Sequence, residues 1–311
     1  MINRRNTIAT LTSGAIATSL GFRSTAQAVH DDKNQSELVQ TISPGTISDY
    51  LHPTAQRIDT NVSLFKWPFR TLPLDQTDKL ESNLRAIGIE RAWAGSFEGV
   101  FQRDIEGVNQ RLVNECANHP FFLPVGSINL SQPSWKKDLN RCIVHHQMHA
   151  IRLHPTYHQY SFDSWSFREL LKIAKENKLL IQIATTLEDT RTQNQLTARA
   201  DANLEQLSER LTSNPHSFIQ LLNYRPTEKT TKILAEHEGL YFDTARVDGT
   251  DGLKQMLHHV PEERLLFGTH APFLIPEASM IRILESGIHT QAAAKILYRN
   301  AAHLSSHMTK P

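Results

Sequence analysis

Residues 264–273 read RLLFGTHAPF and are the most informative part of this chain. Leu265, Leu266 and Phe267 form a short apolar run that ends at Gly268, and His270 follows closely. The proline of the Ala-Pro pair at 271–272 prevents a central strand from continuing, because it has no backbone N–H to donate. Parallel barrels present catalytic groups at the C-terminal tips of their strands. We therefore expect this stretch to be a barrel strand with His270 at its tip.

Outward from this stretch, short apolar runs alternate with segments of helical period. The apolar runs lie at residues 57–64, 90–95, 121–128, 149–154, 179–185, 217–222, 240–243 and 264–269. The helical segments lie at 75–86, 104–118, 133–146, 164–177, 200–213, 227–236 and 250–259, with one or two more within 276–304. Potential helix caps near these starts are Asp75, Asp104, Ser131 and Asp163. Eight such units predict an α/β fold, a parallel (β/α)8 TIM barrel.

An open, doubly wound sheet is the alternative, but the chain contains neither GxGxxG nor GxxxxGK[ST] to support it. A hydrophobic fraction of 39% is enough for a large core, and a net charge of +1 gives no indication of a nucleic-acid partner. We assign the barrel to residues 56–304, a linker or arm to 29–55 and a tail to 305–311.

Residues 1–28 have the pattern of an export signal. Arg4 and Arg5 precede a weakly apolar run at 7–22, and Ala-Gln-Ala at 26–28 resembles a cleavage site. This pattern predicts export by the twin-arginine route to the periplasm or the exterior of a bacterial cell. The apolar run is too short for a membrane anchor. Cys116 and Cys142 are expected to be buried thiols, with a disulfide as the alternative.

Polar residues follow every predicted strand, and the site is expected among them. His270, His154 and Asp243 are the candidate catalytic groups, because a neutral imidazole can act as a general base near pH 7 and a carboxylate can orient it. Arg70 is suited to a substrate carboxylate, which it can hold through two hydrogen bonds. The complete set of candidate substrate-binding residues is Arg70, Asn61, Ser63, His158, Tyr157 and Arg191.

Four segments resemble the amidohydrolase-related family of metal-dependent TIM-barrel hydrolases, a family that also includes decarboxylases of aromatic acids. They are RIDTNVSLFKWPFR at 57–70, AIRLHPTYHQY at 150–160, LLFGTHAPF at 265–273 and ILYRNAAHL at 296–304. In the family, the first strand ends in His-x-His and the eighth in Asp, all of which bind metal. Here Asn61, Ser63 and His270 stand at those positions, so the chain resembles an atypical subgroup.

The resemblance implies a hydrolase for a small polar or anionic molecule. A divalent metal such as zinc is implied by the family, but its usual ligands are not evident, and the candidates His154 and His270 lack a spacing motif. Two alternatives stay open: a binding protein or pseudoenzyme that has lost the metal, and a metal-free lyase or lactonase-like enzyme. The expected partners are a small-molecule substrate and, as in many such barrels, a second copy in a homodimer.

Overall fold

The computed structural model describes residues 56–189, 191–215 and 218–308 of the chain. The predicted export signal at 1–28 and the predicted arm at 29–55 lie outside these residues and stay predictions. Among the helices of the described ranges, none has the length and apolarity needed to cross a lipid bilayer.

Parallel strands form the centre of the described region. They are β1 (Ile58–Leu64), β2 (Arg91–Ser96), β3 (Phe122–Pro124), β4 (Gly126–Ser127), β5 (Ala150–Leu153), β6 (Leu180–Ala184), β7 (Ile219–Leu222), β8 (Leu240–Asp243) and β9 (Leu265–Leu266). β3 and β4 are two parts of one barrel strand, interrupted at Val125, whose N–H donates to Ala94 O at 2.8 Å. All eight predicted strand positions are therefore confirmed.

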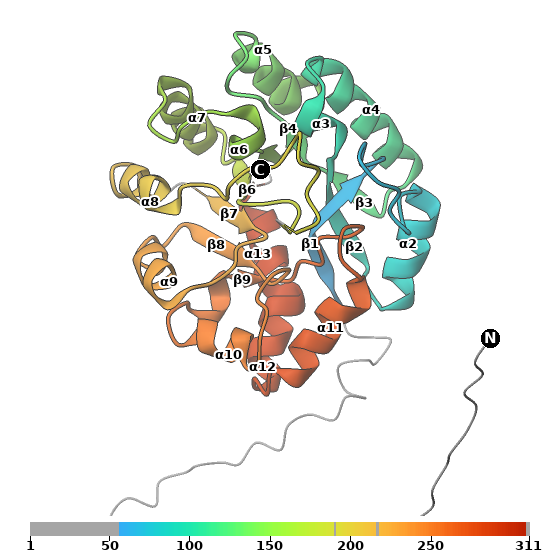
Figure 1. The fold of residues 1–311 in the computed structure, drawn as a ribbon, viewed down its shortest axis with the longest axis vertical. Coiled ribbons are helices and arrows are strands. Elements are labelled where there is room, and N and C mark those ends of the chain that lie inside the picture. The colour runs from blue at the N-terminus through green and yellow to red at the C-terminus, as the bar shows by residue number, and fades with distance from the viewer. Residues whose placement is uncertain (1–55, 190, 216–217, 309–311) are drawn as a thin grey trace, which may run out of the picture. The chain divides into compact units, whose positions relative to one another are not determined.

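Hydrogen bonds between the first and last strands close the barrel. The strands follow one another in sequence order, as β1-β2-β3 and then β4 to β9. The N–H of Thr60 donates to Phe267 O at 2.9 Å, and the N–H of Ser63 donates to Ala271 O at 2.9 Å. This closure confirms the (β/α)8 barrel and excludes the open sheet. Figure 1 shows the strands in the centre of a ring of helices.

Helices follow the strands and cover the outside of the barrel. They are α2 (Thr77–Ala86), α3 (Glu98–Phe101), α4 (Ile105–Asn118), α5 (Trp135–Asn140), α6 (Pro155–His158), α7 (Trp165–Glu176), α8 (Leu204–Thr212), α9 (Glu228–Ala235), α10 (Gly252–Leu257), α11 (Pro276–Glu285), α12 (Thr290–Ala294) and α13 (Asn300–Met308). A π-helical turn joins α12 to α13. The single-turn helices α3 and α6 were not predicted, because one turn is too short to show a helical period.

The helix starts only partly match the caps expected from the sequence. Asp104 caps α4, since its side chain accepts a hydrogen bond from the N–H of Gly107. Ser164, rather than Asp163, caps α7, and it accepts from the N–H of Phe167. α5 begins at Trp135, beyond the expected Ser131. The cap is the one residue with a non-helical backbone whose side chain reaches the first turn, and sequence locates it only to within a residue or two.

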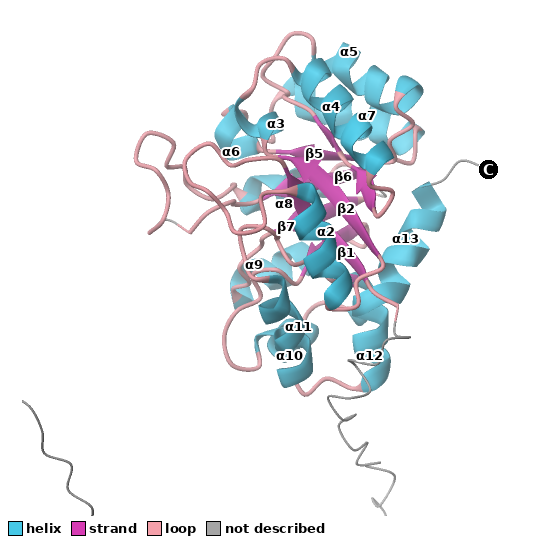
Figure 2. Cartoon of the chain, turned by 90° about the vertical axis from the view of Figure 1, so that its right-hand side faces the viewer, coloured by secondary structure: helices cyan, strands magenta, loops and turns pink. Residues whose placement is uncertain are grey.

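The N-terminal end of the barrel is closed by apolar side chains. Ile58, Trp93 and Leu180 pack there with Leu304 and Met308 of α13. Burying each such side chain stabilises the fold by roughly 1.5–3 kcal/mol. Figure 2 shows α13 at one end of the strands and the long loops at the other. Chemistry is therefore expected at the loop end, where the buried polar residues gather.

The two cysteines are free and buried, as the sequence suggested. Burial raises the pKa of each thiol, Cys116 and Cys142, to about 12, so both stay protonated at neutral pH. Neither is a nucleophile in this environment, because the thiolate is the reactive form.

Candidate active site at the C-terminal end of the barrel

A set of buried polar side chains crosses the interior of the barrel just below the C-terminal strand tips. We call this set the polar layer. Its members, each at most 1% exposed, are Asp59, Thr60, Asn61, Gln182, Gln220, Asn223, Asp243 and Thr269. They come from four strands and from the segment after β9, so the layer links both sides of the barrel closure.

Hydrogen bonds connect the members of the polar layer to one another. Asp59 accepts from Thr269 twice, from Oγ1 at 2.5 Å and from the N–H at 3.1 Å. Gln182 donates to Gln220 Oε1 at 2.8 Å and to Thr60 O at 2.9 Å. Gln220 in turn donates to Thr60 Oγ1 at 2.7 Å. A buried network of paired groups of this kind stabilises a single arrangement.

Asn61 and Asp243, predicted as substrate-binding and catalytic residues, contact each other inside this layer. Asn61 Nδ2 donates to Asp243 Oδ2 at 2.5 Å and to Asn223 Oδ1 at 2.8 Å. The N–H of Asn223 donates to Asp243 Oδ1 at 3.0 Å. Both carboxylate oxygens of Asp243 are therefore occupied by protein donors.

Burial controls the protonation of the carboxyl groups in the layer. It raises the pKa of Asp243 to about 7, although the hydrogen bonds from Asn61 and Asn223 oppose the shift. Burial likewise raises the pKa of Asp59 to about 6, against the hydrogen bond from Thr269. Taking a carboxylate out of water disfavours its charged form, and this effect exceeds the hydrogen bonding at both residues.

Arg152 joins the polar layer to the space above it. Its guanidinium donates to Gln182 Oε1 at 2.9 Å and to Ser63 Oγ at 3.1 Å, so Ser63 is engaged by an arginine. Nη2 of Arg152 has no partner among the described residues. The guanidinium of Arg152 passes close to the backbone of residue 95. Glycine is required there, because a Cβ would lie 2.7 Å from the guanidinium. Burial lowers the pKa of Arg152 only to about 10, so it stays charged.

Sequence reasoning did not select Arg152, although a signal was present. Side chains alternate along a strand, so residues 152 and 154 lie on one face. A charged residue two positions before His154, in the otherwise apolar β5, is that signal.

A second set of side chains lies above the layer, at the C-terminal opening. We call this set the mouth; its members are Arg70, His154, Tyr157, His158, Glu188 and His270.

His154 precedes α6 and is only 3% exposed. Neither of its ring nitrogens has a hydrogen-bond partner among the described residues. Burial, followed by the nearby His158 and Arg152, holds the pKa of His154 well below its usual value, so the ring is neutral.

His270 stands at the strand tip, as predicted, and is 1% exposed. Its Nε2 lies 2.7 Å from Leu187 O, and because a carbonyl only accepts, Nε2 carries the proton. Nδ1 is therefore the basic nitrogen. Burial lowers the pKa of His270 to about 3, and Arg246, Arg152 and Arg70 act in the same direction. The backbone φ of 57° is left-handed, a conformation that costs energy for a residue with a side chain.

His158 and Tyr157 lie in α6, beside the histidine at 154. His158 Nε2 lies 3.0 Å from Gly99 O, so this ring is anchored to the backbone of α3. Burial lowers the pKa of His158 to about 4. The Tyr157 hydroxyl is buried without a partner among the described residues, and burial raises its pKa to about 12. Both predicted substrate contacts keep a free polar group among the described residues, the Tyr157 hydroxyl and Nδ1 of His158.

Arg70 and Glu188 form an ion pair across the mouth. Arg70 Nε lies 3.1 Å from Glu188 Oε1, and the two side chains are 42% and 1% exposed. Despite this distance, neither oxygen of Glu188 receives a hydrogen bond of good geometry from the described residues. Burial raises the pKa of Glu188, while Arg70 lowers it. Arg70 is thus a cation at the entrance, with a buried carboxyl group beneath it.

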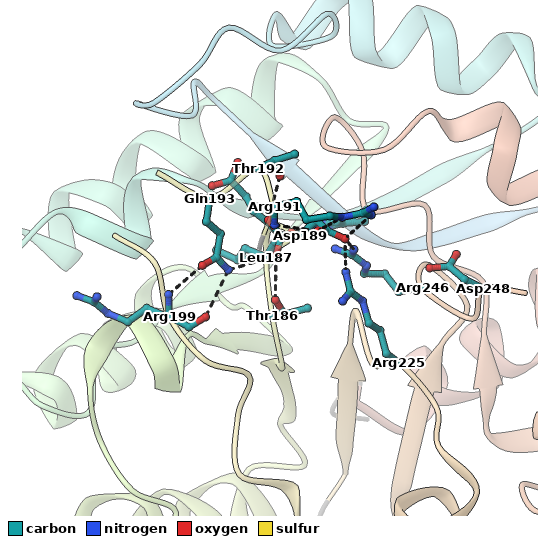
Figure 3. Close-up of polar contacts among 12 residues, drawn as sticks. Thr186, Leu187, Asp189, Arg191, Thr192, Gln193, Arg199, Arg225, Arg246 and Asp248 are labelled. Atoms are coloured by element: carbon teal, nitrogen blue, oxygen red, sulfur yellow. Dashed lines mark hydrogen bonds and ion pairs between the residues drawn. The ribbon is translucent and has the colours of Figure 1, made fainter. Parts of the chain in front are cut away.

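Arg191 lies outside the mouth, on the loop after β6. Its Nε and Nη2 bind the carboxylate of Asp189 at 2.8 and 3.1 Å, as Figure 3 shows. Its side chain is 87% exposed. The structure therefore separates Arg191 from the buried mouth residues with which the sequence grouped it.

The residues of this site do not fit the metal that the family resemblance implies. Catalytic zinc takes about three protein ligands from His, Cys, Asp or Glu. The described residues contain no group of three such side chains placed to hold an ion. Asn61 and Ser63 are engaged by Asp243 and Arg152, and Nε2 of His270 is engaged by a carbonyl.

Comparisons with known proteins agree with the fold. A curated set of protein sequences gives no match. An uncharacterised TIM-barrel protein from Bordetella bronchiseptica superposes with a TM-score of 0.62 at 16% identity, over 82% of this chain and 100% of the other. A 2,6-dihydroxybenzoate decarboxylase from Rhizobium gives 0.63 at 14% identity, over 81% and 98%. A 5-carboxyvanillate decarboxylase from Sphingomonas paucimobilis gives 0.63 at 12% identity, over 81% and 99%.

The family itself is assigned by sequence. The amidohydrolase family profile matches residues 69–304, which include the mouth and seven of the eight barrel strands. The chain belongs to the amidohydrolase family.

Proposed function

We propose that this protein is a metal-independent lyase that removes the carboxyl group from a small, electron-rich aromatic acid bound at the mouth. One observation carries the proposal. Both nitrogens of His154, Nη2 of Arg152 and the Tyr157 hydroxyl are buried without a hydrogen-bond partner among the described residues. Buried polar atoms are nearly always paired, so a polar ligand is expected to complete their bonding.

The neighbouring side chains suit an aromatic ring with an acidic group. Trp67, Phe97 and Phe273 pack edge to face, with ring centroids 4.9–5.4 Å apart. The guanidinium of Arg70 lies 5.3 Å from the centre of the Phe273 ring. Aromatic side chains bind planar rings, and arginine binds carboxylates. Arg70 and Arg152 would receive the carboxylate, and neutral His154 would accept a hydrogen bond from a ring hydroxyl.

The protonation states support a lyase over the hydrolase implied by the resemblance. Without a metal to acidify water, hydrolysis needs an efficient general base. The pKa of His270 is lowered to about 3, so this histidine is a weak base. Decarboxylation instead needs a proton donor, and Glu188 is a buried carboxyl with a raised pKa. The 2,6-dihydroxybenzoate and 5-carboxyvanillate decarboxylases among the structural neighbours support the same reaction class.

A carboxyl group of the mouth supplies the proton that the proposed reaction consumes. Protonated Glu188 gives its proton to the ring carbon that bears the carboxylate. The bond between that carbon and the carboxylate then breaks, its electron pair restores the aromatic ring, and CO₂ leaves. Glu188 recovers a proton from water. The positive charge of Arg70 beside Glu188 stabilises the carboxylate formed after proton transfer.

Hydroxybenzoic acids, assayed for CO₂ release with and without a chelator, test this function. We expect equal turnover with and without chelator. We expect a loss of at least about 100-fold for Glu188→Gln, the usual scale for a catalytic acid. Arg70→Gln should raise KM for the acid by about tenfold, as expected for one lost charge-assisted contact. Glu169→Gln is the matched control, because Glu169 is a helical carboxylate paired with Lys136 on the surface.

Two outcomes would contradict the proposal. Chelator-sensitive turnover that returns with manganese would show a metal enzyme, and ester or lactone cleavage without CO₂ release would show a hydrolase. A binding protein without chemistry is the second candidate, because His154 and His270 are at most 3% exposed and a ligand must displace covering groups to reach them. Tight binding of the acids without turnover would support it.

A further inference from the structure

Three arginines surround a single carboxylate beside the mouth. Arg191 binds both oxygens of Asp189, at 2.8 and 3.1 Å. Nη2 of Arg225 donates to Asp189 Oδ2 at 2.9 Å, and Nη2 of Arg246 lies 3.5 Å from the same oxygen. Figure 3 shows Arg225 and Arg246 approaching Asp189 from the same side.

The three arginines come from three consecutive strand-to-helix connections. Arg191 follows β6, Arg225 follows β7, and Arg246 follows β8. These strands pair in parallel, so their C-terminal ends lie along one edge of the barrel. The barrel topology therefore places the three guanidinium groups together, although they are far apart in sequence.

One N–H of this cluster has no acceptor among the described residues. Asp189 is bonded by Arg191 and Arg225 and lies 3.5 Å from Arg246, and Asp248 and Asp201 also act on Arg246 electrostatically. Asp248, on the loop that carries Arg246, is bound by Arg282 at 3.0 Å. Arg246 is 6% exposed, and its Nε is buried without a partner among the described residues. A buried guanidinium with a free N–H is unfavourable unless an acceptor pairs with that N–H, and beside Arg225 an anion is the acceptor that the local charge favours.

We infer that Arg225 and Arg246 form an oxyanion subsite, with Arg191 at its outer side, for a second acidic group of the substrate. The group is a carboxylate or a phosphate, because an oxyanion can accept the free N–H of Arg246 and an N–H of Arg225 together. The inference that this acidic group belongs to the substrate rests on the proposed function. The inference that an anion binds here does not.

The subsite adjoins the mouth. Leu187 O lies 2.7 Å from Nε2 of His270, and Asp189, two residues further along the same loop, is bound by Arg225 and lies 3.5 Å from Arg246. A substrate with its reacting carboxylate at Arg152 and a second acidic group at Arg246 would therefore span the region above His270. The inferred substrate class is a dianionic aromatic acid.

Calorimetric titration with inorganic phosphate, and separately with acetate, tests the anion site in the purified protein. We expect the wild-type protein to bind at least one of them, and the tighter ligand identifies the group. Arg225→Gln and Arg246→Gln should weaken that binding at least tenfold. Asp189→Asn should tighten it severalfold, because the resident carboxylate competes for the same guanidinium groups. Arg85→Gln is the matched control, since Arg85 is an exposed arginine paired with Glu81 on α2.

The inferred subsite would be overturned if Arg225→Gln bound the anion as tightly as the wild-type protein does, or if Asp189→Asn bound it more weakly. If Arg246→Gln does not fold, the more exposed Arg225 variant and the Asp189 variant decide the question. Isophthalate and benzoate test the substrate class by comparison of their dissociation constants. Isophthalate should bind at least tenfold more tightly, and this advantage should disappear in Arg225→Gln.

If isophthalate and benzoate bound equally tightly while phosphate still bound, the inference of a dianionic substrate would be wrong, but the anion site would remain. These binding measurements do not require turnover. A protein that binds phosphate through Arg225 but decarboxylates no acid would therefore contradict the proposed function alone.

Discussion

The polar layer and the mouth are both buried and both rich in hydrogen-bonding groups, but they differ in how those groups are paired. In the layer, the side chains of Asp59, Gln182 and Gln220 are bonded to other residues of the layer, across the interior of the barrel or its closure. In the mouth, His154 and Tyr157 have polar atoms without hydrogen-bond partners among the described residues. A paired network contributes to stability, whereas unpaired buried groups reduce it and persist where a ligand uses them. Burial and polarity alone therefore do not identify the site.

Asp59→Ala should have the largest effect on stability. The substitution leaves the N–H of Asn61 and both the N–H and the hydroxyl of Thr269 without their acceptor. An unpaired buried donor costs about 1–3 kcal/mol, so we expect a loss of about 3 kcal/mol or more in the free energy of unfolding. Urea denaturation measures it. Asp78→Ala, at a side chain that is 89% exposed, should change stability by less than about 0.5 kcal/mol. Similar losses in both variants would show that the layer is not a stabilising network.

His154→Leu should separate stability from activity. Removing two unpaired buried nitrogens should leave the free energy of unfolding unchanged or slightly higher. Turnover of the acid should fall at least about 100-fold, since the ring no longer accepts a hydrogen bond from the substrate. His158→Leu is the matched comparison: it removes the bond to Gly99 O and should cost about 1–2 kcal/mol. Greater destabilisation by the change at 154 than by the change at 158 would contradict the view that the unpaired ring of His154 does not stabilise the fold.

The pH dependence of stability should have opposite signs in the two regions. Asp243 has a folded pKa of about 7, raised from 3.8, so the folded state holds more protons between these values. Its contribution to stability is complete below pH 3.8 and declines as the pH rises to 7. His154, His158 and His270 have lowered pKa values, so their contribution declines as the pH falls below 6.5.

Asp243→Asn should therefore make stability rise more steeply with pH between 4.5 and 6.5. The expected change in slope is up to about 1.4 kcal/mol per pH unit, the effect of one proton. His154→Leu should change the slope in the opposite direction. Urea denaturation at pH 4.5, 5.5 and 6.5 measures both, and parallel curves for the wild type and the two variants would refute the assigned protonation states.

The positions of the site residues were largely predictable, but their roles were not. Strand periodicity located His154, Asp243 and His270 at strand tips, where the structure has them. It did not show that Asn61 and Asp243 bond to each other, because they are 182 residues apart in sequence. For Arg191 the sequence indicated a loop position only, and side chains in loops have no fixed period from which a direction can be inferred.

The barrel could be inferred from the sequence alone. Strands and helices follow from hydrophobic periods of two and 3.6 residues, which are local properties, and eight alternations leave few ways to bury the apolar faces. The pairing of the polar groups, in contrast, depends on how the chain folds in three dimensions. Asp59 meets Thr269 across 210 residues, and His270 meets Leu187 O across 83. Such partners are set by barrel closure and strand order. Among the described residues, His154 and the Tyr157 hydroxyl have none, and this difference separates the mouth from the layer.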